Sequence, residues 1–189
     1  MGRVKLPLTQ EEIAALTEIA QRLDEKTGGF EGRSYLQSLL WFLKTGMHPQ
    51  CLTANWQPVA RIIEEGGAKY VMWRRTKKKD IRGITKLVLS KDIESFAIEF
   101  IQNLPIRRQF WNELFIRLEQ AALAKYPHHI GIAGLCPLQL RHTCAVELLR
   151  KGVHAEIIRQ ALNVSPQTLA YYVKMVPEML AKEMQNVNW

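Results

Sequence analysis

Apolar residues recur at helical spacing along most of this 189-residue chain, and only one stretch departs from that pattern. The first apolar stripe begins with Ile13, Leu16 and Ile19, and Thr9 with Glu12 forms a capping box in front of it. A short helix is expected at 51–56, continuing toward Ile63. Further stripes predict helices at 34–44, 92–103, 108–125, 138–151, 154–162, 165–174 and 177–185. The pattern therefore requires a fold built mainly from packed helices.

Residues 69–74 and 84–89 form the exception, because they are rich in strand formers or alternate in polarity. A lysine-rich turn lies between them, so the two segments predict an antiparallel hairpin. The expected fold class is thus mainly α with a small antiparallel β-sheet (α+β). No repeat, low-complexity tract or linker interrupts the chain, which favours a single domain over residues 1–189.

The charge balance narrows the class of partner. The formal net charge is +8 and the pI about 9.5, which favours polyanions, with nucleic acid ahead of an acidic membrane surface. No apolar run approaches the roughly 20 residues that span a bilayer, and the start lacks the apolar stretch of a signal peptide. The expected location is the cytoplasm or the nucleoid, with no membrane partner.

The three cysteines, Cys51, Cys136 and Cys144, indicate neither a disulfide framework nor a zinc site. Their number is odd and no pair has C-x-x-C spacing, so small core residues are the simplest interpretation. No metal or other cofactor is expected.

The segment 140–153 is the most informative for function. It predicts a helix that ends at Gly152, with Arg141 in its first turn. Cations stabilise the opposite end of a helix, so a functional reading is that the Arg141 fork and backbone N–H groups hold a phosphate. The alternative is an ordinary surface arginine, and position alone favours that alternative.

Leu-Arg-His-Thr at 140–143, followed by an alanine, two leucines and Gly-Val, resembles the second conserved-arginine box of the tyrosine recombinase (phage integrase) family. Thr45-Gly46 and the residues after it resemble the first-arginine box. The lysines at 77–79 stand where the family carries its catalytic lysine, and 162–172 resembles the segment that ends in its nucleophilic tyrosine. These boxes follow in family order from about residue 7 to the C-terminus. The resemblance implies a recombinase catalytic domain, and the separate core-binding domain that usually precedes it is not expected within residues 1–189. The chain is then either a piece of a longer protein or a stand-alone catalytic-type domain.

Three positions depart from the family pattern. His48 replaces the first arginine, Leu138 replaces the histidine three residues before the second arginine, and Asn163-Val164 replaces a glycine-histidine pair. The active site is therefore expected to be degenerate, because each lost donor typically costs about two to three orders of magnitude in rate.

The resemblance assigns roles to the residues that remain. Tyr172, with Tyr171 as its alternate, would attack a phosphate to form a phosphotyrosyl bond. Arg141 would clamp that phosphate, Lys77 would act as the acid, and a protonated His48 would partly replace the missing arginine. Contacts to double-stranded DNA are expected from Arg74, Arg75, Lys78, Lys79 and His142. The activity implied is DNA recombination or integration, as in phages and mobile elements.

Two other readings stay open at this stage. Residues 156–169 also resemble a helix-turn-helix, which would make the protein a regulator that binds DNA without catalysis. Alternatively, the chain is a catalytically inactive domain that assembles with active recombinases through the apolar stripe of its last helix, at 177–185. The same helix is the expected contact of a homo-oligomer. Packing of that stripe within its own chain is equally consistent with the sequence.

Overall fold

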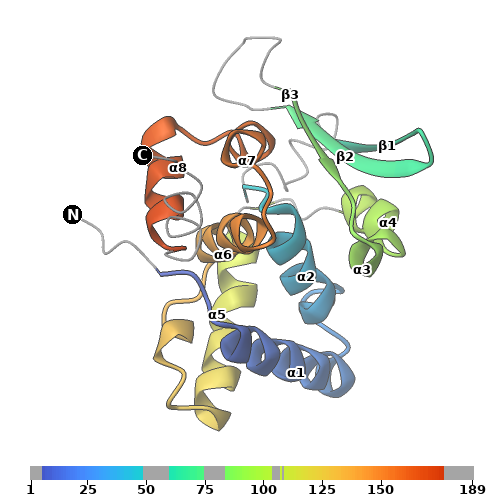
Figure 1. The fold of residues 1–189 in the computed structure, drawn as a ribbon. Helices are drawn as coiled ribbons and strands as arrows, with labels where there is room; N and C mark the ends of the chain where they lie inside the picture. Colours follow the sequence, from blue (N-terminus) through green and yellow to red (C-terminus); the bar gives the residue numbers. More distant parts are fainter. Residues whose placement is uncertain (1–5, 49–59, 75–83, 104–106, 108, 177–189) are drawn as a thin grey trace.

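The structure, a computed structural model, describes residues 6–48, 60–74, 84–103, 107 and 109–176. Helices surround a central helix, α6, and a small sheet lies to one side of them (Figure 1). The helices are α1 (Gln10–Thr27), α2 (Tyr35–Thr45), α3 (Lys91–Glu94), α4 (Ala97–Gln102), α5 (Gln109–Lys125), η4 (Ile130–Ile132), α6 (Pro137–Arg150), α7 (Ala155–Leu162) and α8 (Pro166–Lys174). The expected class, mainly α with a small antiparallel sheet, is confirmed.

The sheet has three strands in the order β1-β2-β3: β1 (Ala60–Glu65), β2 (Ala68–Arg74) and β3 (Ile84–Val88). Both pairs are antiparallel, and Val71 lies opposite Ile62 on one side and Leu87 on the other. The two predicted strands are therefore confirmed. The predicted continuation of a helix toward Ile63 is wrong, because Gly66 and Gly67 turn the chain with φ of 58° and 76° and β1 pairs with β2. The expected helix at 51–56 lies outside the described residues.

Helix boundaries follow local signals where those signals are strong. The predicted capping box is present: Thr9 accepts a hydrogen bond from the Glu12 amide, and the Glu12 carboxylate accepts one from the Thr9 amide. The predicted helix at 92–103 is instead two short helices, α3 and α4. The break brings Phe96 into the core, where its ring centroid lies 6.0 Å from that of Phe100. The helix expected at 177–185 lies outside the described residues.

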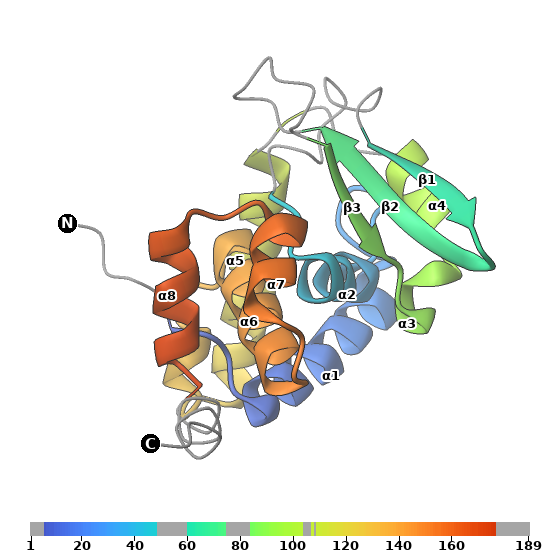
Figure 2. The same ribbon diagram turned by 45° about the horizontal axis from the view of Figure 1, so that its top comes forward.

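Two apolar clusters hold the fold together. The first core is aromatic and joins α1, α2, α4 and α5; Trp41 stacks on Phe100 at 4.7 Å between ring centroids, and Phe42 meets Trp111 edge-on. The second core joins α6, α7 and α8 and consists of Ala145, Val146, Leu149, Ile158, Leu162, Val164, Tyr172 and Val176. Because α6 contributes to both cores, it connects them, as its place between α2 and α8 in Figure 2 shows.

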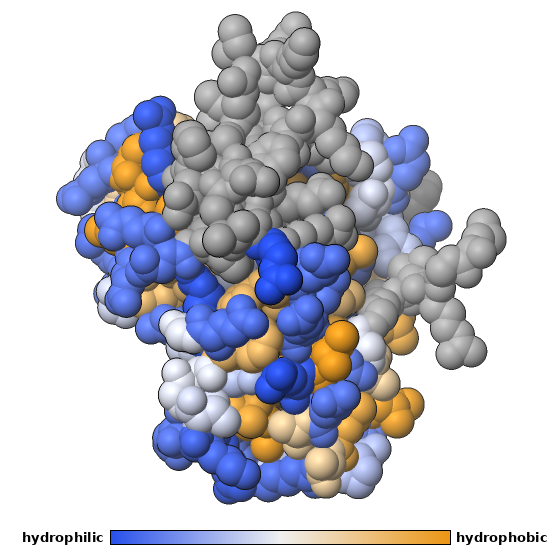
Figure 3. All heavy atoms as spheres, turned by 180° about the vertical axis from the view of Figure 1, so that it is seen from behind, coloured by the Kyte–Doolittle hydropathy of each residue, from blue (hydrophilic) through white to orange (hydrophobic). Residues whose placement is uncertain are grey.

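The surface shows hydrophilic residues with apolar ones among them (Figure 3). Within the described ranges, no helix is long and apolar enough to cross a membrane. Cys144 is buried, as expected of a core residue, whereas Cys136 is only partly buried, and both are free thiols. Cys51 lies outside the described residues.

The joint between the two cores lies at Gly46, the left-handed C-cap of α2, with φ of 55°. A Cβ atom added there would lie 2.8 Å from the Leu162 Cδ2 and 3.2 Å from the Cys144 Sγ. The close approach of α2 to α6 and α7 therefore requires glycine on two grounds, its backbone conformation and its lack of a side chain.

Replacing Gly46 with alanine is expected to lower the free energy of unfolding by about 2–5 kcal/mol. Left-handed backbone costs an L-residue about 1–2 kcal/mol and overpacking typically costs about 1–3 kcal/mol. Urea denaturation measures the loss. The matched control is Gly152→Ala, where φ is 78° but no atom lies within 4 Å of the added Cβ, so only the backbone cost applies. Equal losses in the two variants would contradict the close packing at Gly46.

Candidate functional site

The fold brings three of the predicted site residues together. Arg141 and His142 lie on α6, and Tyr172 lies on α8, which packs against α6. His48 follows the end of α2, and Arg74 is the last residue of β2. The remaining predicted residues, Arg75, Lys77, Lys78 and Lys79, lie outside the described residues. The described part of the site is therefore the contact between α6 and α8, with the end of α2 beside it.

Arg141 is buried, with 8% of its surface exposed, so it is not an ordinary surface arginine. Its Nη1 donates a hydrogen bond to the Gly46 carbonyl at 2.7 Å, and its Nη2 donates to the Leu162 carbonyl. These carbonyls stand at the C-terminal ends of α2 and α7. Such ends carry carbonyls without helical partners and a partial negative charge. Two helix ends thus stabilise the buried cation.

Tyr172 lies in the second core, with 1% of its surface exposed. Its Oη is 2.7 Å from the Nδ1 of His142, and the two ring centroids are 5.4 Å apart. Tyr171, the alternate nucleophile, is only partly buried, and its ring centroid lies 6.3 Å from that of Tyr172. The two tyrosines therefore differ in environment, and it is Tyr172 whose hydroxyl is held by a histidine.

The surroundings shift the pKa of both members of this pair. Burial lowers the pKa of His142, and the neighbouring Arg141 charge lowers it further. Burial raises the pKa of Tyr172, while Arg141 opposes that rise. Both groups are therefore neutral near pH 7. In the tautomer of the neutral imidazole that carries its proton on Nε2, Nδ1 is the acceptor and the Tyr172 phenol donates the hydrogen bond to it. Burial also raises the pKa of the Cys144 thiol to about 12, which makes that thiol unreactive.

Leu138 and Asn163-Val164, two of the three places that depart from the family pattern, bear side chains that do not transfer protons. Leu138 is 47% exposed in the first turn of α6, Val164 is buried in the second core, and Asn163 forms the left-handed C-cap of α7. His142 was predicted as a DNA contact, and its bond to Tyr172 was not foreseen. The two residues are 30 positions apart, and no spacing rule in the sequence links them.

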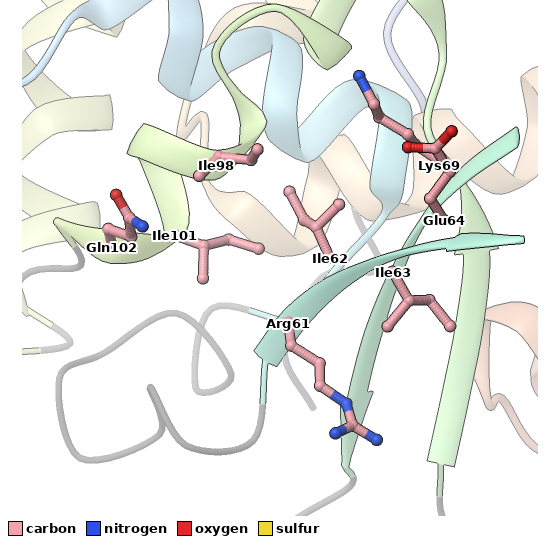
Figure 4. Close-up of a pocket in the computed structure, with 8 residues that line it drawn as sticks. All are labelled: Arg61, Ile62, Ile63, Glu64, Lys69, Ile98, Ile101 and Gln102. Carbon is pink, nitrogen blue, oxygen red and sulfur yellow. The ribbon is translucent and has the colours of Figure 1, made fainter.

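A separate groove lies between the sheet and α4 and has a volume of about 410 Å³ (Figure 4). Ile62 points toward Ile98 and Ile101 across it. None of the predicted site residues lines this groove. Its lining consists of Arg61, Ile62, Ile63, Glu64, Lys69, Ile98, Ile101 and Gln102. Across the part of the chain that the structure describes, no group of three or more His, Cys, Asp or Glu residues is placed to hold a metal ion.

Comparison with solved structures identifies the fold. The chain is similar to the Tn1549 transposon integrase in complex with circular intermediate DNA, with a TM-score of 0.65 and 14% identity over 90% of this chain. It is also similar to the same integrase in complex with transposon right end DNA, with a TM-score of 0.65 and 15% identity over 98% of this chain. XerH site-specific recombinase bound to palindromic difH substrate gives a TM-score of 0.64 and 15% identity over 97% of this chain. The tyrosine recombinase fold expected from the sequence is therefore confirmed.

The match spans only part of these proteins: 63% and 67% of the two integrase chains and 54% of the XerH chain. No protein-family model matches the sequence, and no curated protein matches it either. The comparisons thus identify the fold of the chain, at low sequence identity.

Replacing Arg141 with lysine is expected to destabilise the protein in the absence of DNA by about 2–3 kcal/mol. One ammonium cannot span the Gly46 and Leu162 carbonyls, so a buried acceptor loses its partner. Thermal or urea unfolding without DNA measures the effect. Arg150→Lys is the control, because Arg150 lies exposed on the same helix and pairs with Glu147 at the surface, where such changes stay within about 0.5 kcal/mol. Equal stability of both variants would show that the Arg141 fork does not hold the helix ends.

Proposed function

We propose that this chain binds duplex DNA and acts in site-specific recombination, through a phosphotyrosyl link to Tyr172. The observation that carries the proposal is the contact between α6 and α8, where the Tyr172 hydroxyl lies 2.7 Å from His142 Nδ1 and the neighbouring Arg141 charge lowers the pKa of Tyr172 against the effect of burial. It occurs on a fold shared with recombinases whose solved structures are complexes with DNA. The net charge of +8 agrees with a polyanionic partner.

In the proposed reaction the Tyr172 oxygen attacks the scissile phosphate, and a deoxyribose hydroxyl leaves. Arg141 stabilises charge on the non-bridging oxygens, and Lys77 protonates the leaving oxygen. His48 assists at the position of the absent arginine. The phosphotyrosyl bond conserves the energy of the broken bond, so rejoining requires no nucleotide or metal cofactor. Arg74, Arg75, Lys78 and Lys79 contribute contacts to the DNA phosphates.

The buried position of Tyr172 adds a condition to this proposal. With 1% of the residue exposed, a phosphate reaches the hydroxyl only after the second core opens beside it. Helix α8 is the element suited to that movement, because it has only nine residues and follows the left-handed residue Asn163. DNA binding is therefore expected to precede exposure of the nucleophile.

The alternative is a regulator that binds DNA without cutting it. The helix pair α7 and α8, joined through Asn163, has the order of elements that a helix-turn-helix requires. The sheet and helices α1 and α2 exceed what such a motif needs, and they belong to the fold shared with the recombinases. Assembly into homo-oligomers through 177–185 is compatible with either function.

Binding to duplex DNA is expected to weaken steeply with salt. Each neutralised phosphate releases counterions, so the logarithm of the binding constant falls with the logarithm of salt concentration by about 0.9 per phosphate contact. Fluorescence anisotropy of a labelled duplex between about 50 and 200 mM salt measures the slope. An affinity that does not change over this range would rule out the proposed phosphate contacts.

Incubation with nicked suicide duplexes is expected to give a covalent protein–DNA adduct that is lost in Tyr172→Phe and retained in Tyr171→Phe. Phenylalanine keeps the ring in the core but removes the attacking oxygen. A denaturing gel reads the adduct. The yield should build slowly, because a missing donor costs about two to three orders of magnitude in rate.

The pattern across the two variants separates the candidate functions. An adduct lost only in Tyr171→Phe would move the nucleophile to the neighbouring residue. No adduct on a substrate library that the protein binds in a salt-sensitive way would favour the regulator.

A further inference from the structure

The attack by Tyr172 needs a group that accepts the phenolic proton, and the structure holds such a group in place. We propose that His142 is a catalytic residue, which takes the proton from the Tyr172 Oη as that oxygen attacks phosphorus. The inference rests on the proposed function, since it concerns the same site. It assigns His142 a role at the reacting oxygen in addition to any contact with DNA.

Arg141 and His142 are adjacent on α6 but contact different elements. Successive residues point about 100° apart around a helix, so Arg141 and His142 face different neighbours. Arg141 reaches the ends of α2 and α7, whereas His142 faces α8 and lies 2.7 Å from the Tyr172 Oη. Leu138, one turn earlier on α6, has no group that accepts a proton. Among the described residues, His142 is thus the imidazole in contact with the nucleophile.

Burial is the largest influence on the pKa of both groups, and the charged and titratable neighbours shift the pKa of Tyr172 in opposing directions. Arg141 lowers the pKa of His142 and also that of Tyr172, so it keeps the imidazole neutral and favours the phenolate as it forms. Cys144 on α6 and Tyr171 on α8 raise the pKa of Tyr172. Burial opposes the charged form of both groups. The proton therefore stays on Tyr172 at rest and moves only when a phosphate takes up the developing charge.

The proposed step balances as follows. The O–H bond of Tyr172 breaks, its proton moves to His142 Nδ1, and the bond from Oη to phosphorus forms. The bond from phosphorus to the deoxyribose oxygen breaks, and that oxygen leaves as a hydroxyl with the proton from Lys77, the proposed acid. In rejoining, the hydroxyl attacks phosphorus, and the imidazolium returns its proton to the Tyr172 oxygen.

The first test needs no cleavage. The pKa of His142 is followed by NMR titration of the ring protons in the wild type and in Tyr172→Phe. Loss of the donated hydrogen bond removes support for the neutral imidazole, so the pKa should rise by about half a unit to one unit. An unchanged or lower pKa would overturn the proposal, because the phenol would then not be donating to His142.

The second test is the pH dependence of adduct formation on a nicked duplex. In the wild type the rate should rise with pH through the His142 pKa, which lies below the ordinary imidazole value, and then level off. His142→Asn keeps a hydrogen-bonding group near Nδ1 but accepts no proton. This variant should slow the reaction by about 10²–10⁴-fold and abolish the rise in rate with pH, which is the acid limb of the profile. The control is His128→Asn, at an exposed histidine in the loop after α5. It should leave both the rate and its pH dependence unchanged.

The outcomes separate this inference from the proposed function. Full activity and an unchanged acid limb in His142→Asn would reduce His142 to a packing role while recombination stands. If the wild type binds the DNA but forms no adduct, the proposed strand cleavage is contradicted, and the proposed role of His142 is contradicted with it. If His142→Asn does not fold, as judged by thermal unfolding, the titration of the wild type against Tyr172→Phe decides.

Discussion

The buried guanidinium of Arg141 is the interaction on which the arrangement of the domain depends. It bridges the Gly46 and Leu162 carbonyls and so connects the last turns of α2 and α7, one from each core. A cation removed from water is costly unless hydrogen bonds and opposite charge compensate it. Two helix C-termini supply both through unpartnered carbonyls and the negative ends of their dipoles. The left-handed residues Gly46 and Asn163 end these helices at that point, which presents the carbonyls to the arginine.

Four consecutive residues of α6 contact distant parts of the chain, which explains why polar side chains are buried on this helix. Arg141 holds the ends of α2 and α7, and His142 holds Tyr172 on α8. The Thr143 hydroxyl accepts a hydrogen bond from the Leu8 amide at 3.0 Å, and Cys144 packs at Gly46. The residues of this short box therefore hold neighbouring elements in place from several sides of the helix. The resemblance of residues 140–143 to a recombinase box consequently indicates the fold more firmly than it indicates catalysis.

The sequence predicted those features of the fold that have local causes. The Thr9 and Glu12 capping box, the helix ends at Gly46 and Gly152, and the pairing of 69–74 with 84–89 all follow from neighbouring residues. Strand β1 was missed because its identity depends on pairing across Gly66-Gly67 rather than on its own composition. The break between α3 and α4 was missed because burial of Phe96 in the aromatic core overrides helical continuity. The partners of Arg141 lie 95 and 21 residues away, a distance that no local pattern encodes.

Packing alone does not account for the His142–Tyr172 pair. Phenylalanine at 172 would fill the same space among Val146, Leu162 and Val176, and it would avoid the cost of burying a hydroxyl. An apolar residue at 142 would equally avoid the cost of removing an imidazole from water beside the Arg141 charge. Replacing both partners of a buried hydrogen bond by apolar groups of similar shape is often neutral or stabilising. The second core thus contains a polar contact that packing does not require, at the hydroxyl that we propose as the nucleophile.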